Sequence, residues 1–81
     1  MRKDFWSHHN EMVRDLSEAQ TPTALWIARN RWAKECVSRY VAAFRDTSLS
    51  LSERDGRCAS AGVLYQSVED TYAASLSDLG F

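Results

Sequence analysis

The sequence predicts an all-α protein built as an antiparallel arrangement of three helices. Apolar residues recur at three- and four-residue spacing through most of the 81 residues, which is the period of amphipathic helices. The chain contains only one Pro and three Gly, too few for the many tight turns of a β-sandwich or barrel. Helix-capping residues mark two boundaries, near residues 21 and 50, and these divide the chain into three segments.

Thr21-Pro22 separates the first two helices, expected over about residues 3–19 and 22–46. A Thr hydroxyl can cap a first turn, and Pro suits the first helical position because its missing N–H would be unpaired there. The apolar residues of the second helix cover an arc of roughly 140°, wider than the usual stripe of about 100°, so this helix should be central. These residues are Leu25, Trp26, Trp32, Ala33, Cys36, Val37, Tyr40, Ala43 and Phe44.

A third helix is expected over about residues 50–79. Ser50 and Glu53 match a capping box, and Gly80 is placed to end the helix in a left-handed conformation. Gly56 leaves a bend or break open, because Gly inside a helix costs about 1 kcal/mol relative to Ala. The apolar stripe of this helix comprises Leu51, Cys58, Ala61, Tyr65, Val68, Tyr72, Leu76 and Leu79.

Short connections make successive helices antiparallel neighbours. In the resulting register Trp32 lies opposite Tyr65, and Cys36 lies opposite Ala61. The chain is expected to be one helical domain, residues 1–81, with a modest core because it is so short. Two forms stay open: a closed three-helix bundle, or a hairpin with a third helix that completes its core by forming a homodimer.

Composition narrows the function classes. A hydrophobic content of 44% with 26% charged residues is ordinary globular usage. The net charge of −1 argues against nucleic-acid binding by bulk charge. No segment approaches the roughly 20 apolar residues that a membrane span needs. The first twenty residues hold seven charged side chains and no apolar run, so a cytoplasmic location with free thiols is expected.

Arg29 is unusual because it lies near the middle of the apolar arc. A guanidinium that leaves water needs a partner. One interpretation is an internal pair with Glu69, or a side chain that reaches the edge of the bundle. The alternative is an arginine that binds a partner protein.

The remaining reactive side chains are better explained by packing. His8 and His9 are adjacent and point about 100° apart on a helix, so they cannot chelate one ion well, and no metal site is expected. Cys36 and Cys58 fall on predicted core faces, where a thiol behaves as a small apolar group. No phosphate-binding loop, catalytic triad or paired-carboxylate site is evident. We therefore expect neither an enzyme nor a cofactor.

The expected function is protein binding, by a small inhibitor or adaptor of the kind that phages and bacteria encode. The polar side of the second helix is basic: residues 22–46 hold five basic and two acidic residues. Nucleic-acid association through this basic side is an alternative, although exposed aromatic residues for base stacking are missing from it. An aromatic residue at the edge of an apolar arc can also anchor a second chain. The candidate contact residues are Ile27, Arg31, Lys34 and Arg39 on the basic side, with Trp6 and Trp26 at the arc edges.

The segment from Arg14 to Asp46 resembles phasins, the small helical proteins that coat polyhydroxyalkanoate granules. The resemblance consists of an amphipathic helix, the Thr21-Pro22 break, and a helix with Leu25, Trp32 and Tyr40 at regular intervals. It covers about 40% of the chain. It implies an amphipathic face that meets the granule surface and a protein that associates with itself.

Overall fold

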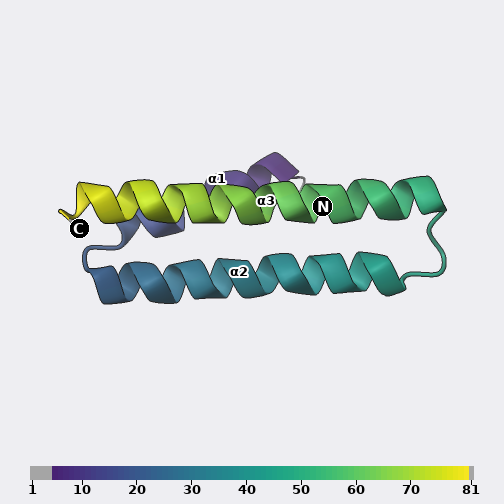
Figure 1. Cartoon of the computed structure of the whole chain (residues 1–81), viewed down its shortest axis with the longest axis horizontal. Coiled ribbons are helices and arrows are strands. Elements are labelled where there is room, and N and C mark those ends of the chain that lie inside the picture. Colours follow the sequence, from purple (N-terminus) through teal and green to yellow (C-terminus); the bar gives the residue numbers. More distant parts are fainter. Residues whose placement is uncertain (1–4, 81) are drawn as a thin grey trace.

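Three helices form an elongated antiparallel bundle in the computed structural model of the chain, which describes residues 5–80 (Figure 1). The helices are α1 (Phe5–Glu18), α2 (Pro22–Arg45) and α3 (Leu51–Asp78). This confirms the all-α class. The expected start of the first helix at residue 3 lies outside the described residues, and the other ends fall at most one residue inside the expected ranges, where capping residues take over.

The helix caps are the ones that the sequence predicts. The Thr21 hydroxyl accepts the Ala24 N–H at 3.1 Å, and Pro22 follows it at the first helical position. The Ser50 hydroxyl accepts the Glu53 N–H at 3.1 Å. Gly80 has a φ of 90°, a left-handed conformation that glycine adopts without the steric cost of a Cβ.

Helix α3 runs without interruption through Gly56, so the bend or break left open there does not occur. A Cβ built at this glycine would meet no atom within 4 Å, so no close approach of another segment requires the glycine. Its cost of about 1 kcal/mol relative to Ala is smaller than what the packing of a long helix contributes. Helix α3 is therefore one continuous helix, and both α1 and α2 pack against it.

The two long helices form an antiparallel hairpin, and α1 lies along one side of it (Figure 1). Helix α1 has 14 residues and α3 has 28, so α1 can cover only half the length of the hairpin at 1.5 Å per residue. It covers the half that holds the start of α2 and the end of α3. The half next to the α2–α3 loop has no helix over it among the described residues.

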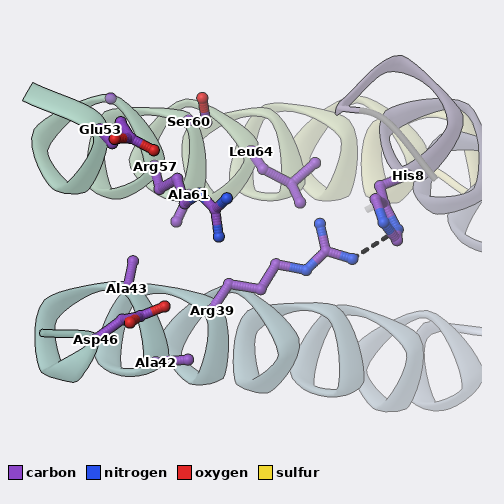
Figure 2. A pocket seen from close by; sticks show the side chains of 11 residues that line it. His8, Arg39, Ala42, Ala43, Asp46, Glu53, Arg57, Ser60, Ala61 and Leu64 are labelled. Carbon is purple, nitrogen blue, oxygen red and sulfur yellow. Dashed lines mark hydrogen bonds between the residues drawn. The ribbon is translucent and has the colours of Figure 1, made fainter. Parts of the chain in front are cut away.

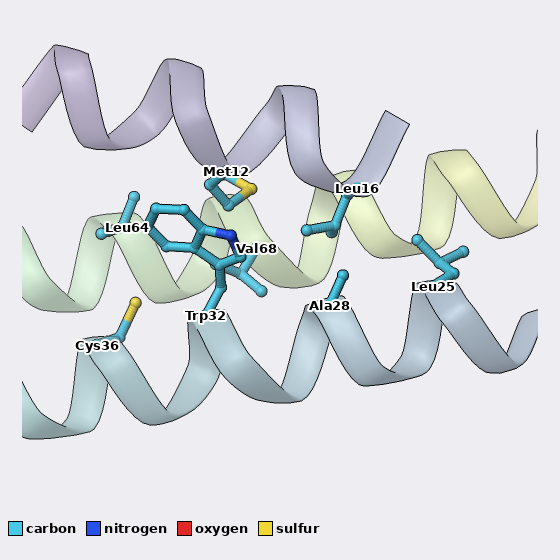
Figure 3. Close-up of a cluster of buried hydrophobic side chains, with 8 residues drawn as sticks. All are labelled: Met12, Leu16, Leu25, Ala28, Trp32, Cys36, Leu64 and Val68. Carbon is cyan, nitrogen blue, oxygen red and sulfur yellow. The ribbon is translucent and has the colours of Figure 1, made fainter. Parts of the chain in front are cut away.

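The core forms where all three helices meet (Figure 3). Met12 and Leu16 reach down from α1 and are fully buried. Trp32 lies beneath them, 8% exposed, and its indole N–H donates to the Asp15 carboxylate at 2.9 Å. The cluster comprises Met12, Leu16, Leu25, Ala28, Trp32, Cys36, Leu64 and Val68.

The predicted register between α2 and α3 agrees with the contacts. Arg29 pairs with Glu69, the rings of Trp26 and Tyr72 meet, and the Cys58 thiol lies against the Tyr40 carbonyl. Each pair corresponds, within one residue, to the alignment that places Trp32 opposite Tyr65. The helices therefore pack side by side as expected.

The predicted core was wrong on one side of the hairpin. Several residues of the predicted apolar faces are exposed instead, among them Val37, Tyr40, Phe44, Leu51 and Tyr65. Leu64, which the predicted stripe omitted, is buried. The reason is the position of α1: it packs on the side of the hairpin that carries Leu64, and the described chain places nothing on the opposite side.

Candidate interaction surfaces

The side of the hairpin opposite α1 exposes a row of large apolar side chains, which we call the open face. Leu51 is 73% exposed and Phe44 is 62% exposed, and the grouping of such side chains on one side is more informative than the exposure of any one of them. A monomeric protein rarely exposes a contiguous apolar patch of more than a few hundred Å². The open face comprises Trp26, Val37, Tyr40 and Phe44 of α2 with Leu51 and Tyr65 of α3.

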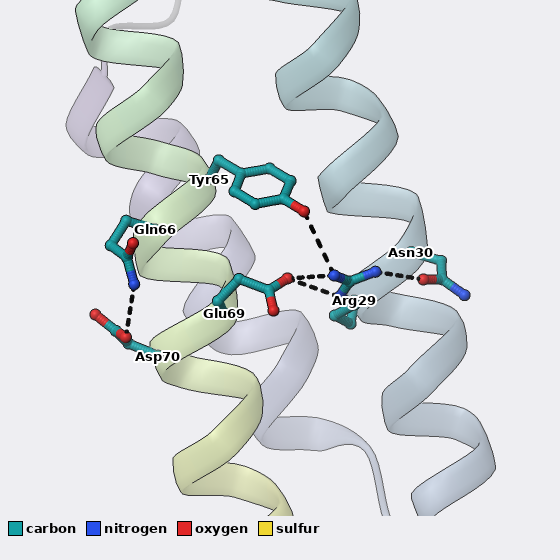
Figure 4. Close-up of polar contacts among 6 residues, drawn as sticks. All are labelled: Arg29, Asn30, Tyr65, Gln66, Glu69 and Asp70. Carbon is teal, nitrogen blue, oxygen red and sulfur yellow. Dashed lines mark hydrogen bonds and ion pairs between the residues drawn. The ribbon is translucent and has the colours of Figure 1, made fainter.

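Helical geometry aligns these residues along the hairpin. Trp26 and Phe44 are about five full turns apart on α2 and so point in the same direction. Leu51 and Glu69 have the same spacing on α3. Figure 4 looks onto this side, with α1 behind the two long helices. The open face thus runs from the first turn of α2 to the loop end of the hairpin.

The pair between Arg29 and Glu69 is the main polar feature of the open face (Figure 4). The Arg29 Nε donates to a Glu69 carboxylate oxygen at 2.8 Å, and its guanidinium lies 5.2 Å from the centre of the Trp26 ring. The Arg29 side chain is 19% exposed, so it reaches the edge of the bundle while pairing internally. The charge of Arg29 is already neutralised by Glu69, so a binding partner does not have to supply an acidic residue for it.

A hollow of about 210 Å³ opens in the open face at the seam between α2 and α3. Small residues form part of its wall, including Ala61 and Gly62. Tyr40 and Phe44 stand beside it with their rings stacked at 6.4 Å. The open face therefore offers both protruding aromatic rings and a recess of the size that one large side chain would fill.

The contact patch predicted from the sequence forms a separate stripe on the outer side of α2. Ile27, Arg31 and Lys34 lie at helical spacing and are all exposed. Arg31 is paired with the Asp15 carboxylate of α1 at 3.3 Å. These three residues form a continuous stripe, but Ile27 is the one large apolar side chain among them, in contrast to the open face.

Three further candidate residues lie in different places. Trp26 belongs to the open face, where its ring meets that of Tyr72 edge-on at 5.9 Å. Trp6 is exposed on α1 and packs against His9 at 5.8 Å. Arg39 bonds to Glu35 one turn away at 3.0 Å and points into a groove on the α1 side. The six predicted contact residues therefore do not form one surface.

The groove on the α1 side has a volume of about 910 Å³ and continues the line of α1 toward the loop (Figure 2). Arg39 from α2 and Arg57 from α3 point into it. An Arg39 guanidinium nitrogen lies 2.6 Å from His8 Nδ1, and because a guanidinium can only donate, this ring nitrogen accepts. Asp46 and Glu53 line the loop end. Positive and negative groups in the groove are thus balanced.

Asp46 stabilises the turn at the loop end of the groove. Its carboxylate accepts the Ser48 N–H at 3.0 Å and also the Ser48 hydroxyl. These hydrogen bonds, with a smaller contribution from Arg57 and Arg54, lower the pKa of Asp46 below its ordinary value. The carboxylate thus has a structural role in ordering the turn between the long helices.

The two cysteines are free thiols in different surroundings. Cys36 is buried in the core, and this burial raises its pKa, partly offset by the nearby Arg39. Cys58 is half-buried against the Tyr40 carbonyl. Within residues 5–80, no three His, Cys, Asp or Glu side chains come together as metal ligands would.

Comparisons with protein-family models, curated protein sequences and solved structures gave no match to this chain. None of the helices in the described part of the chain is long and apolar enough to span a membrane. The function is therefore inferred from the two surfaces of the hairpin. Sequence reasoning assigned most residues of the open face to the core; the signal that pointed to the open face was the apolar arc of α2, wider than one neighbouring helix can cover.

Proposed function

We propose that the protein is a non-enzymatic helical module that binds another protein chain through the open face. The observation that carries this proposal is the row of exposed apolar side chains opposite α1. Covering such surface removes it from water, which is the main driving force of protein association. The aromatic residues in the row are of the kind that dominate binding energy at interfaces.

The open face also has the layout of a protein-binding surface. Its centre is apolar, and the polar side chains of Arg29 and Glu69 already satisfy one another. A partner can therefore bury this region without leaving an unpaired charge, which would oppose binding. An inhibitor or adaptor that occupies a partner surface needs no more chemistry than this.

A granule coat of the phasin type is a second candidate, and the extent of the open face favours it. The face runs along a hairpin 46 Å in its longest dimension and is apolar at both ends. Such a face could lie on a hydrophobic particle. Nucleic-acid binding through the basic side of α2 has less support, because the carboxylates of Asp15 and Glu35 already pair with Arg31 and Arg39.

The proposal is tested by placing a photo-crosslinking amino acid at Phe44 and, in a separate variant, at Ile27. Both positions are exposed and apolar, 62% and 60% respectively, but only Phe44 belongs to the open face. The full-length variants are irradiated in cells of the source organism, and adducts are identified by mass spectrometry. We expect a protein adduct from Phe44 and none, or far less, from Ile27.

Three other results would contradict the proposal. Adducts from Ile27 alone would move the binding surface to the outer stripe of α2. Lipid or polymer adducts from Phe44, together with sedimentation of the chain with granules, would favour the coat protein. Absence of adducts from both positions would remove the support for a binding module.

A further inference from the structure

The open face has features that identify its occupant, and this inference rests on the function proposed above. We infer that the occupant is a second copy of the same chain. The two hairpins lie face to face and point in the same direction, so that α2 of each copy packs on α3 of the other. The two hairpins then form a four-helix bundle, with one α1 on each outer side.

The exposed apolar area of the open face is sufficient for a dimer. Aromatic side chains bury roughly 150–250 Å² each, so four of them with the smaller Val37 and Leu51, each about half exposed, present on the order of 600 Å². Two copies would bury about 1,200 Å² before any polar rim is added, which reaches the range of stable specific interfaces. The face is thus large enough for a dimer of this small chain without a second binding region.

The open face is also complementary in shape to itself. It carries the protruding Tyr40 and Phe44 rings and, beside them, the hollow of about 210 Å³ at the helix seam. In a symmetric dimer, the ring of one copy can enter the hollow of the other and the reverse, as knobs enter holes between packed helices. A different partner would have to match both features; a second copy has both.

Charged residues at the loop end fix the direction of the two hairpins. Arg45 follows Phe44 at the outer edge of α2, and Asp55 lies one turn after Leu51 at the outer edge of α3; both are exposed at the loop end. With the hairpins pointing the same way and α2 on α3, Arg45 of one copy comes near Asp55 of the other at both edges. In the opposite direction, α2 packs on α2, and Arg45 meets residues 22–30, which contain no acidic residue.

The distribution of apolar side chains favours the same direction. Val37, Tyr40, Phe44 and Leu51 are concentrated in the half of the face next to the loop, whereas the other half holds Trp26 together with the Arg29–Glu69 pair. Hairpins pointing the same way place the loop half against the loop half. Hairpins pointing in opposite directions would place the Arg29–Glu69 pair against apolar side chains of the loop half.

The first test measures the mass of the full chain by light scattering and sedimentation over a range of concentrations. We expect twice the chain mass of 9.2 kDa. The double substitution Phe44→Glu/Leu51→Glu should weaken dimerisation by at least about 100-fold, because it places carboxylates against a partner's apolar surface. Ile27→Glu and Val63→Glu alter similarly exposed apolar residues outside the open face and should leave the dimer intact.

The substituted side chains are exposed in the single chain, so the variants are expected to keep their helices, and circular dichroism checks this. A monomeric wild-type chain at all concentrations would overturn the inference. If Phe44 still cross-linked to a different protein in that case, the proposed function would stand without it. A dimer unaffected by the double substitution would also overturn the inference, since another surface would then be responsible.

The second test addresses direction. Tyr40 lies at the helix seam, beside the symmetry axis of hairpins that point the same way. Tyr40→Cys in a Cys36→Ala/Cys58→Ala background should therefore form a disulfide-linked dimer on mild oxidation, and Val63→Cys in the same background should not. In the opposite direction the two Tyr40 positions would be roughly 20 Å apart, given 1.5 Å per residue, too far for a disulfide. A dimer without this disulfide would overturn the same-direction arrangement.

Discussion

The two sides of the α2–α3 hairpin share one backbone arrangement but differ in what covers them. On the α1 side, Met12 and Leu16 close over Trp32 and Leu64, and all four side chains are buried. On the open face, residues of similar size remain in contact with water. The difference shows that apolar residues along a helix predict that another element packs against them. Which element does so depends on the other helices in the chain. Here α1, with 14 residues, packs on one side of α2 and leaves the apolar residues on the other side exposed.

The largest expected effect on stability comes from truncating one large apolar side chain on each side of the hairpin to Ala. Leu64→Ala should lower the free energy of unfolding by about 2–5 kcal/mol, since it leaves a cavity where α1, α2 and α3 meet. Phe44→Ala should change it by less than about 0.5 kcal/mol in the monomer, since its ring is exposed there. Urea unfolding at a concentration low enough for single chains measures both. Equal losses would mean that the two sides do not differ in cover.

The effect of protein concentration on stability should differ between the two sides of the hairpin. Binding that is specific to the folded state adds to the apparent stability. If two copies associate through the open face, the cost of Phe44→Ala grows as the concentration rises, while the cost of Leu64→Ala keeps its value. A cost for Phe44→Ala that does not change with concentration would count against the dimer.

Two tryptophans provide a smaller test of the same difference. Trp32→Phe keeps an aromatic ring in the core but removes the N–H that donates to Asp15 at 2.9 Å. We expect a loss of about 1–2 kcal/mol, from one hydrogen bond to a carboxylate together with reduced packing. The matched control is Trp26→Phe on the open face, where the ring is half exposed and the expected change in the monomer is below about 0.5 kcal/mol. Thermal unfolding monitored by circular dichroism compares the two variants.

Local signals in the sequence were sufficient for the helices and their ends. The Thr21 and Ser50 caps, the proline and Gly80 act through hydrogen bonds and backbone angles within a few residues, and the structure has each of them where it was expected. The antiparallel register also followed, since short loops leave little freedom. The Arg29–Glu69 pair was one of the interpretations left open, and the register brought its two residues together.

The side chains that face water could not be assigned in the same way. Periodicity identifies an apolar arc but does not state which part of it a short helix will cover. Tyr65 and Leu64 are neighbours in sequence, and the packing of α1 decides that Leu64 is buried and Tyr65 is not. Most residues of the open face were consequently predicted to be part of the core. The predicted contact residues Ile27 and Lys34 lie on the polar side of α2, outside the open face.

The smallest expected effect concerns the charged pair on the open face. A double-mutant cycle with Arg29→Met and Glu69→Gln should give a coupling energy of about 0.2–1 kcal/mol, because both side chains keep contact with water and the attraction is weakened there. The matched pair is Arg31 and Asp15, at 3.3 Å with Arg31 65% exposed, whose coupling should be smaller still. Urea unfolding at low and at 1 M salt measures both cycles, and salt should reduce both values. A coupling of several kcal/mol for Arg29 and Glu69 would show that the pair is shielded from water, so that the open face is already covered at the concentration used.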